Sequence, residues 1–186
     1  MELFAGAPVD EVTVQDIAAA VDMTPAAVYY HFASKEQILV EGLRQFADRL
    51  LAEVRAYVPT SADGGRDTDG AGEGIAALLT HVVTWAGQVR PEATVYFVNS
   101  LGLNLMVESM RREVRVELIE ILRPAVLAVR PALSGAEAGV MAVALVSLIE
   151  TALASMLNGD SVHSGFGTTR FVAEVAAVAD RITGAG

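Results

Sequence analysis

The chain has 186 residues, of which 53% are hydrophobic, and a formal net charge of −10 at pH 7. This length fits one domain or two small ones and is enough to bury a helical core without covalent cross-links. Because the sequence contains no cysteine, it cannot form disulfides, use a thiol nucleophile or build a cysteine-based zinc site. We expect a cytoplasmic protein, because no basic segment followed by a small-residue cleavage site opens the chain.

Apolar residues recur at helical spacing almost throughout, and no segment alternates polar and apolar residues over the length of a strand. The sequence therefore predicts an all-α protein. Thr13, Thr24, Ser34 and Ser134 are each placed as a helix N-cap. Between Pro59 and Gly74 the composition predicts a flexible loop. The expected helices cover residues 13–21, 24–31, 34–57, 75–89, 92–107, 109–130, 134–158 and 168–183, with breaks at Pro91, Pro131 and the turn 158–160.

Residues 138–158 form a long apolar run in which Glu150 is the only ionisable residue. A run of this length could span a bilayer. Its Ala and Ser content, the Glu150-Thr151 pair and the lack of Lys or Arg close to either end argue against that interpretation. We expect a buried helix at a subunit interface and no membrane partner.

The two short capped helices near the start of the chain, followed by a longer one, predict a helix-turn-helix. Polar and aromatic side chains remain on the outer face of its second helix, at Tyr29, Tyr30 and His31. The residues expected to close its small core are Ile17, Ala18, Val21, Met23, Val28 and Phe32.

This segment resembles the DNA-binding head of the TetR family of bacterial transcriptional regulators. The resemblance covers roughly the first 45 residues, and its most specific part is the string Tyr29-Tyr30-His31-Phe32 followed by Lys35-Glu36. It implies that residues 24–31 enter the major groove of double-stranded DNA. The residues that it assigns to DNA binding are Thr13, Gln15, Thr24, Pro25, Ala26, Ala27, Tyr29, Tyr30, His31 and Lys35.

Several of these residues also have an interpretation that needs no DNA. Thr13 and Thr24 cap helices in either case, Tyr29 suits a half-buried position, and Lys35 alone is a solvated charge. The functional interpretation depends on the joint spacing of the set.

Three positions depart from the family pattern. Asp22 stands where a glycine usually turns the chain, Gln15 where an arginine is common, and residues 6–9 where a glycine-aromatic pair is favoured. Up to Phe46 the chain carries two basic and seven acidic residues, a net charge of −5, which opposes DNA binding. Met1 falls inside the family's first helix, so we expect that the chain is truncated or that its true start lies upstream.

The resemblance implies a division into a DNA-binding domain over 1–46, with its first helix cut short, and an effector-binding and dimerisation domain over 47–186. It also implies a homodimer formed by the helices expected at 134–158 and 168–183. The apolar character of the first of these independently predicts burial in an interface. Dimerisation would place two recognition helices about 34 Å apart on a pseudo-palindromic operator.

The helices expected at 75–89 and 92–107 are the predicted walls of a small-molecule pocket, because apolar side chains with a few polar anchors suit such a site. The same residues also suit an ordinary core, and Glu150 also suits a pair across the dimer interface. The predicted ligand-binding residues are Leu78, His81, Val82, Trp85, Tyr96, Phe97, Asn99, Leu103, Met106, Met110, Met141, Glu150 and Thr151.

Arg111, Arg112 and Arg115 lie among acidic residues, and the Glu108–Arg112 spacing suits an ion pair on a helix surface. We interpret this group as a solvated face, with an anchor for an anionic ligand as the alternative.

We expect no enzyme, no cofactor and no metal. The histidines are far apart in the sequence, no glycine-rich loop follows a strand, and no nucleophile elbow is present. The sequence predicts a ligand-responsive regulator, a repressor released from its operator by a small apolar or amphipathic effector; the repressor sign comes from the resemblance, and activation stays open. The alternative is a helical ligand sensor or interaction protein with a weakened DNA-binding head, and a helical enzyme comes third.

Overall fold

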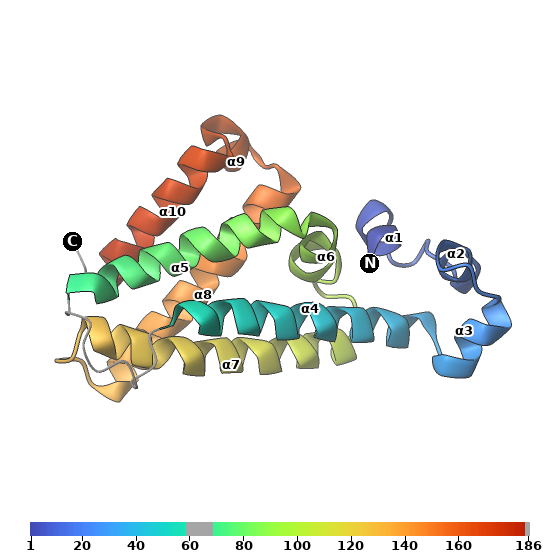
Figure 1. The fold of residues 1–186 in the computed structure, drawn as a ribbon, viewed down its shortest axis with the longest axis horizontal. Coiled ribbons are helices and arrows are strands. Elements are labelled where there is room, and N and C mark those ends of the chain that lie inside the picture. Colours follow the sequence, from blue (N-terminus) through green and yellow to red (C-terminus); the bar gives the residue numbers. More distant parts are fainter. Residues whose placement is uncertain (59–68, 185–186) are drawn as a thin grey trace.

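The computed structural model describes residues 1–58 and 69–184, and over these residues it contains helices and no strand. The predicted all-α class is therefore confirmed. The elements are α1 (Glu2–Gly6), α2 (Val14–Ala20), α3 (Pro25–His31), α4 (Lys35–Tyr57), α5 (Asp69–Gln88), α6 (Arg90–Thr94), the π-helical turn η1 (Val95–Asn99), α7 (Leu105–Val129), α8 (Gly135–Asn158), α9 (Ser161–Phe166) and α10 (Thr168–Thr183) (Figure 1).

The long helix α4 joins a small head to a larger body (Figure 1). The head consists of α1, α2 and α3 and lies at one end of the molecule, and the body consists of α5 to α10. Within the body, α7 runs alongside α4, α8 packs along α7, and α10 packs along α5. The head is thus held away from most of the body on the first turns of α4.

One continuous apolar core runs through the body and reaches into the first part of the head. It extends from Phe4 on α1 to Ala179 on α10 and includes Val9 and Val12 of the loop before α2. The ring of Phe46 on α4 lies 5.4 Å from that of Trp85, and also packs against the two aromatic rings of η1. This aromatic cluster joins α4, α5 and η1.

The helices α2 and α3 have a separate and much smaller core of three buried residues, Val14, Ala18 and Val28. The sequence prediction for this core was partly wrong, because Val21 is 56% exposed and Met23 is 40% exposed. Both lie in the turn between the two helices, where their side chains point away from the small core.

The predicted N-caps are confirmed at all four positions: Thr13, Thr24, Ser34 and Ser134 each accept a hydrogen bond from a backbone N–H in the first turn. The C-termini of two body helices are capped by arginines. Arg90 donates to the carbonyl oxygen of Leu157 at 2.9 Å, and Arg130 donates to that of Thr183 at 3.1 Å. These guanidinium groups satisfy carbonyls that have no partner within the helix, and they place positive charge at the negative end of the helix dipole.

Some predicted helix boundaries were wrong. Helix α5 begins at Asp69 and not at 75, and residues 59–68 of the predicted loop lie outside the described residues. The predicted helix 92–107 is interrupted over 100–104, where Gly102 has a φ of +69° and Asn104 caps the start of α7. Helix α9, which Asp160 caps, was not predicted. The predicted breaks at Pro91, Pro131 and 158–160 are confirmed.

Helix α8 is long and apolar enough to cross a membrane by length and composition, with 24 residues and a mean hydropathy of 2.1. In the fold it packs against α5, α7 and α10. Only 44% of its most apolar window is buried in the chain, so much of its apolar surface faces outward.

Asp22 is the one non-glycine residue with a positive φ, +52°, among the described residues. A left-handed backbone costs an L-residue about 1–2 kcal/mol, less for Asp than for most. We expect Asp22→Gly to raise the free energy of unfolding of the head by about 0.5–1 kcal/mol, measured by hydrogen exchange of the α2 and α3 amides. Asp22→Asn, which also tolerates this conformation, is the control. Equal or lower protection in the glycine variant would contradict the expected strain.

The cap of α8 predicts a pH dependence of stability. Hydrogen bonds from the backbone N–H and hydroxyl of Ser134 lower the pKa of the Glu137 carboxyl from its ordinary 4.5. Because the folded pKa is the lower one, this stabilisation is present above pH 4.5 and is lost as the pH falls through the folded value. Glutamine also completes a capping box. In chemical denaturation, the wild type should therefore lose stability relative to Glu137→Gln on acidification, and parallel pH profiles would contradict this account.

Candidate nucleic-acid interface

The turn between α2 and α3 is built from backbone hydrogen bonds at the end of α2. The N–H groups of Val21 and Met23 both donate to the carbonyl oxygen of Ala18, and that of Asp22 donates to Ala19. The left-handed Asp22 then reverses the chain so that Thr24 can cap α3. Two short helices joined in this way, with Val14, Ala18 and Val28 buried between them, form a helix-turn-helix.

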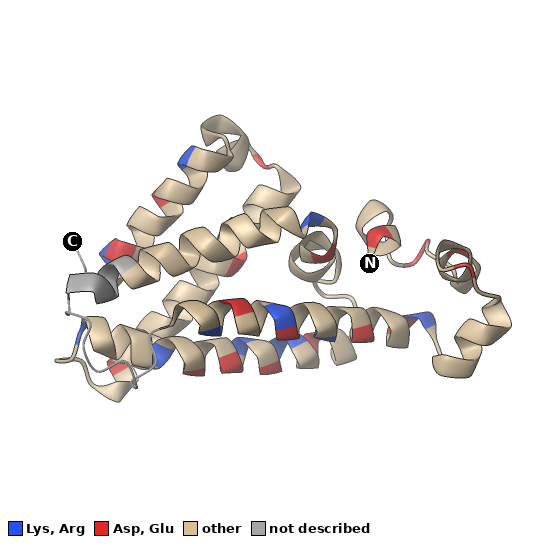
Figure 2. Cartoon of the chain, in the orientation of Figure 1, with Lys and Arg blue, Asp and Glu red and all other residues tan. Residues whose placement is uncertain are grey.

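The outer face of α3 is exposed and uncharged. Pro25, Ala26, Tyr29 and His31 are exposed, and Tyr30 is the most open aromatic side chain of the face at 85%. The ring of Tyr30 meets that of His31 edge-on at 5.1 Å. Figure 2 shows that α3 carries no Lys, Arg, Asp or Glu, in contrast to α4 and α7. The face therefore offers rings, methyl groups and two phenolic hydroxyls to a partner.

The N-terminus of α2 is already occupied by a carboxylate of the chain itself. Asp16 accepts hydrogen bonds from the backbone N–H of Thr13 at 2.9 Å and from its hydroxyl at 2.6 Å. These bonds lower the pKa of the Asp16 carboxyl below its ordinary range. Thr13, predicted to hold a phosphate, would therefore share its donors with an anion that is already in place.

Thr24 has fewer hydrogen bonds to the chain itself than Thr13 has. Its hydroxyl oxygen accepts from the N–H of Ala27 at 3.2 Å, and the first turn of α3 contains no acidic residue. Gln15 is exposed on the first turn of α2, and Ala27 is half-buried behind the outer face. The structure thus brings the predicted DNA-binding residues of α2 and α3 to one end of the head, and their contact with DNA stays a prediction.

Lys35 has a structural role that the sequence did not indicate. Its ammonium group donates to the carbonyl oxygens of Val9 at 2.9 Å, Asp10 at 3.1 Å and Val12 at 2.8 Å. An ammonium has three N–H donors, so these bonds use all of them. Lys35 therefore fastens the loop before α2 to the start of α4. No local pattern could have revealed this, because the partners lie 23 to 26 residues away in the sequence.

The predicted ligand-binding residues are spread over the body. Leu78, Val82 and Met110 are buried in the main core, and Trp85, Tyr96 and Phe97 form the aromatic cluster around Phe46. Burial raises the pKa of the Tyr96 hydroxyl to about 12, so this group stays protonated.

The remaining predicted ligand-binding residues lie outside this aromatic cluster. His81 on α5 hydrogen-bonds Glu53 of α4 at 2.6 Å, and the ring of Tyr57 stacks on it. Met106 and Thr151 are exposed, Met141 is half-buried, and Glu150 forms an ion pair with Arg115. The predicted Glu108–Arg112 ion pair does not form; Glu108 accepts from the backbone N–H of Gly102 instead.

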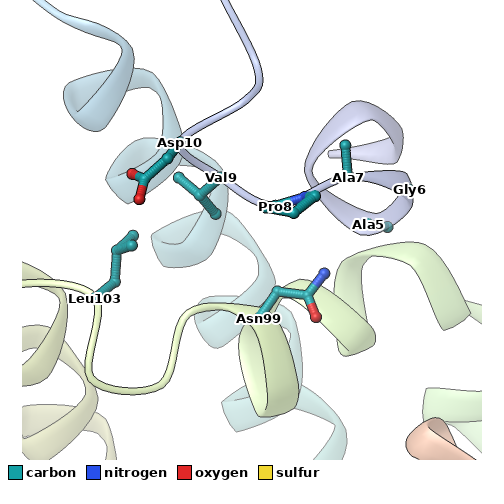
Figure 3. A pocket seen from close by; sticks show the side chains of 8 residues that line it. All are labelled: Ala5, Gly6, Ala7, Pro8, Val9, Asp10, Asn99 and Leu103. Carbon is teal, nitrogen blue, oxygen red and sulfur yellow. The ribbon is translucent and has the colours of Figure 1, made fainter.

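Asn99 and Leu103 lie at the junction between the head and the body. The side-chain amide of Asn99 donates to the carbonyl oxygen of Phe4 on α1 at 2.9 Å. Beside this bond is an open cleft of about 500 Å³, walled by residues 5–10 of the head on one side and by Asn99 and Leu103 on the other (Figure 3). The end of η1 thus meets α1 directly.

The chain therefore has a helix-turn-helix with its second helix exposed, which the long helix α4 joins to an all-helical body. Residues 1–41 match the sequence model of the bacterial regulatory proteins of the tetR family. A stretch of 61 residues is 39% identical to the HTH-type transcriptional repressor KstR2 of Mycobacterium tuberculosis. This stretch is 33% of the chain and 30% of the length of that repressor.

The fold resembles solved structures over nearly the whole chain. A bacterial regulatory protein of the tetR family from Rhodococcus RHA1 has a TM-score of 0.72 at 23% identity, covering 98% of this chain and 91% of its own. A TetR transcriptional regulator from Legionella pneumophila has a TM-score of 0.67 at 19% identity, covering 97% and 94%. The first 41 residues thus match the sequence model of the tetR family, and the fold of the whole chain resembles solved structures of that family.

The contacts of Lys35 and Tyr30 predict opposite effects on stability. Lys35→Met keeps the aliphatic stem but removes three charge-assisted hydrogen bonds, and we expect it to lower the free energy of unfolding of the head by about 2 kcal/mol. Tyr30→Ala alters an exposed side chain and should change it by less than about 0.5 kcal/mol. Hydrogen exchange of the head amides measures both. Unchanged protection in Lys35→Met would show that the ammonium contributes no net stability.

Proposed function

We propose that the protein is a homodimeric transcriptional regulator, a repressor that a small-molecule effector releases from a pseudo-palindromic operator. The observation that carries this proposal is the match of the first 41 residues to the family together with the exposed, uncharged face of α3. The identity with a repressor over 61 residues supports the sign of regulation. In this proposal residues 1–46 bind DNA, and residues 47–186 bind the effector and dimerise, with no catalytic step.

DNA binding would use the outer face of α3 in the major groove. Tyr30 and His31, at the C-terminus of α3, would contact the sugar-phosphate backbone, and so would Thr24 at the N-terminus of α3. Ala26 and Tyr29 would face the base edges, where methyl groups and a ring can contact thymine methyl groups. Because α3 has no arginine, asparagine or glutamine, the shape of the DNA would supply much of the discrimination.

Dimerisation would cover apolar surface that a single chain leaves exposed. On α8, Val140 is 71% exposed and Val143 is 41% exposed, although the helix as a whole is strongly apolar. Two more apolar side chains, Val162 and Phe166 on α9, are exposed beyond its C-terminal end. Burial of such surface between two copies is the dominant favourable contribution to protein association.

Effector binding would reach the head through η1. This turn contributes Phe97 to the aromatic cluster of the body, and Asn99 at its end is bonded to Phe4 of α1. An effector can shift the spacing of two heads only if it binds one arrangement more tightly than the other. A displacement of η1 that strains the Asn99 bond would provide that difference.

A second function is favoured by one observation. The acidic head, with the carboxylate of Asp16 at the start of α2, suits a ligand sensor whose head no longer binds DNA. The two functions differ in whether the purified protein binds its own upstream DNA.

We expect saturable binding of the dimer to DNA from upstream of its own gene, resistant to competitor DNA and weaker at higher salt, because released counterions drive the association. Titration at two salt concentrations by fluorescence anisotropy measures this. Tyr30→Ala should weaken binding by about tenfold, and Tyr57→Ala, at the end of α4 that lies away from the head, is the matched control. If a folded dimer binds its upstream DNA no more tightly than random DNA, the result would support the ligand sensor instead.

A further inference from the structure

Three arginines of α7 line a cleft that is separate from the junction with the head. The cleft has a volume of about 280 Å³ and is lined by Leu101, Glu108, Arg111, Arg112, Arg115 and Glu150. It holds three positive and two negative side chains, in a chain with a net charge of −10. This concentration of arginine is therefore unusual for the molecule.

Of the two carboxylates of the cleft, Glu150 has a cationic partner and Glu108 has only a neutral one. Glu150 is paired with Arg115, which also donates to the hydroxyl of Ser147 at 2.7 Å. Glu108 accepts from the backbone N–H of Gly102 at 2.9 Å. The acidic residues thus hold the walls of the cleft in place.

Among the described residues, Arg111 and Arg112 have no ion-pair partner, and with the carboxylate of Glu108 they leave the cleft with a net charge of +1, three positive minus two negative side chains. Arg111 donates to the carbonyl oxygen of Tyr96, a neutral group, and its guanidinium lies 4.7 Å from the centre of the Tyr96 ring. Arg112 is exposed, and it takes part in no ion pair or side-chain hydrogen bond within the part of the chain that the structure describes. Both guanidinium groups line the cleft, and a guanidinium group can donate two parallel N–H bonds to a carboxylate.

The cleft adjoins an apolar cavity through Glu150, which lines both. The other residues of the cavity are all apolar: Leu50, Val54, Phe97, Leu118, Leu122, Val146 and Ile149. Its volume of about 10 Å³ has room for a single water molecule. An apolar chain that entered past Glu150 would therefore have to displace side chains, among them Phe97 of η1.

We propose that this cleft binds the carboxylate of an amphipathic effector whose aliphatic tail enters the adjoining cavity. Arg111 and Arg112 hold the carboxylate, and the Arg115–Glu150 pair stands at the entrance of the apolar part. Anion binding draws Arg111 away from the Tyr96 carbonyl while the tail displaces Phe97. Both movements act on η1, and through Asn99 they reach α1. The role of this ligand as an effector rests on the proposed function, whereas its binding does not.

Calorimetric titration of the full chain, without DNA, with octanoate and with octanol tests the site. We expect octanoate to bind more tightly than octanol. Arg112→Gln should weaken octanoate binding by about tenfold, as expected for one charge-assisted hydrogen bond, and should leave octanol binding unchanged. Arg123→Gln is the matched control, because Arg123 lies on the same helix but pairs with Glu120 outside the cleft. Arg111→Gln provides a second test at the inner side of the cleft.

Equal affinities for octanoate and octanol, or octanoate binding that neither arginine variant weakens, would overturn the proposal. A folded protein that binds no octanoate would also contradict the proposal. These outcomes do not depend on DNA binding. If the protein binds octanoate but not its operator, the regulator proposal is refuted and the ligand site is supported. If it binds its operator but not octanoate, the ligand site is refuted and the regulator proposal is supported.

Discussion

The packing of Phe46 is the contact on which the rest of the fold depends. Its side chain is almost fully buried, and its ring touches the rings of Trp85 on α5 and of Tyr96 and Phe97 on η1. Buried aromatic rings contribute large apolar areas and prefer defined relative orientations. One residue of α4 therefore fixes the position of the helix that carries the head against the two elements that face the interior of the body. Any shift of η1 must be accommodated at this cluster and, through Asn99, at α1.

The regular parts of the fold were predictable because their signals are local. A hydroxyl residue before an apolar stripe marks the start of a helix, and Thr13, Thr24, Ser34 and Ser134 all do so. The interruption between η1 and α7 was missed although Gly102 and Asn104 carry the usual signals of a break, because the apolar spacing continues through them. The exposure of Val21 and Met23 was missed for another reason: hydrophobicity does not tell on which side of a turn a residue lies.

The exposed face of α3 was predictable from the sequence, whereas the contacts between distant segments were not. The order of Thr24, Tyr29, Tyr30 and His31 places them on one helix, and the structure exposes them together. The strain at Asp22 was also predictable, since the position needs a left-handed backbone. The bonds from Lys35 to the loop 9–12 and the arginine cleft both depend on how distant segments meet. Sequence spacing alone contains no information on such contacts.

The small core of α2 and α3 has a thermodynamic consequence. Only Val14, Ala18 and Val28 are buried there, whereas the body has a continuous core of several dozen side chains. Regions with few buried contacts open at a lower free energy than the whole molecule. Helices α2 and α3 therefore open locally at a lower free energy than the body, and a partner that orders them must offset the conformational entropy that they lose. The affinity of any partner for the face of α3 then depends partly on the fraction of time that α2 and α3 spend folded, and solution conditions that change this fraction change the affinity without altering the body.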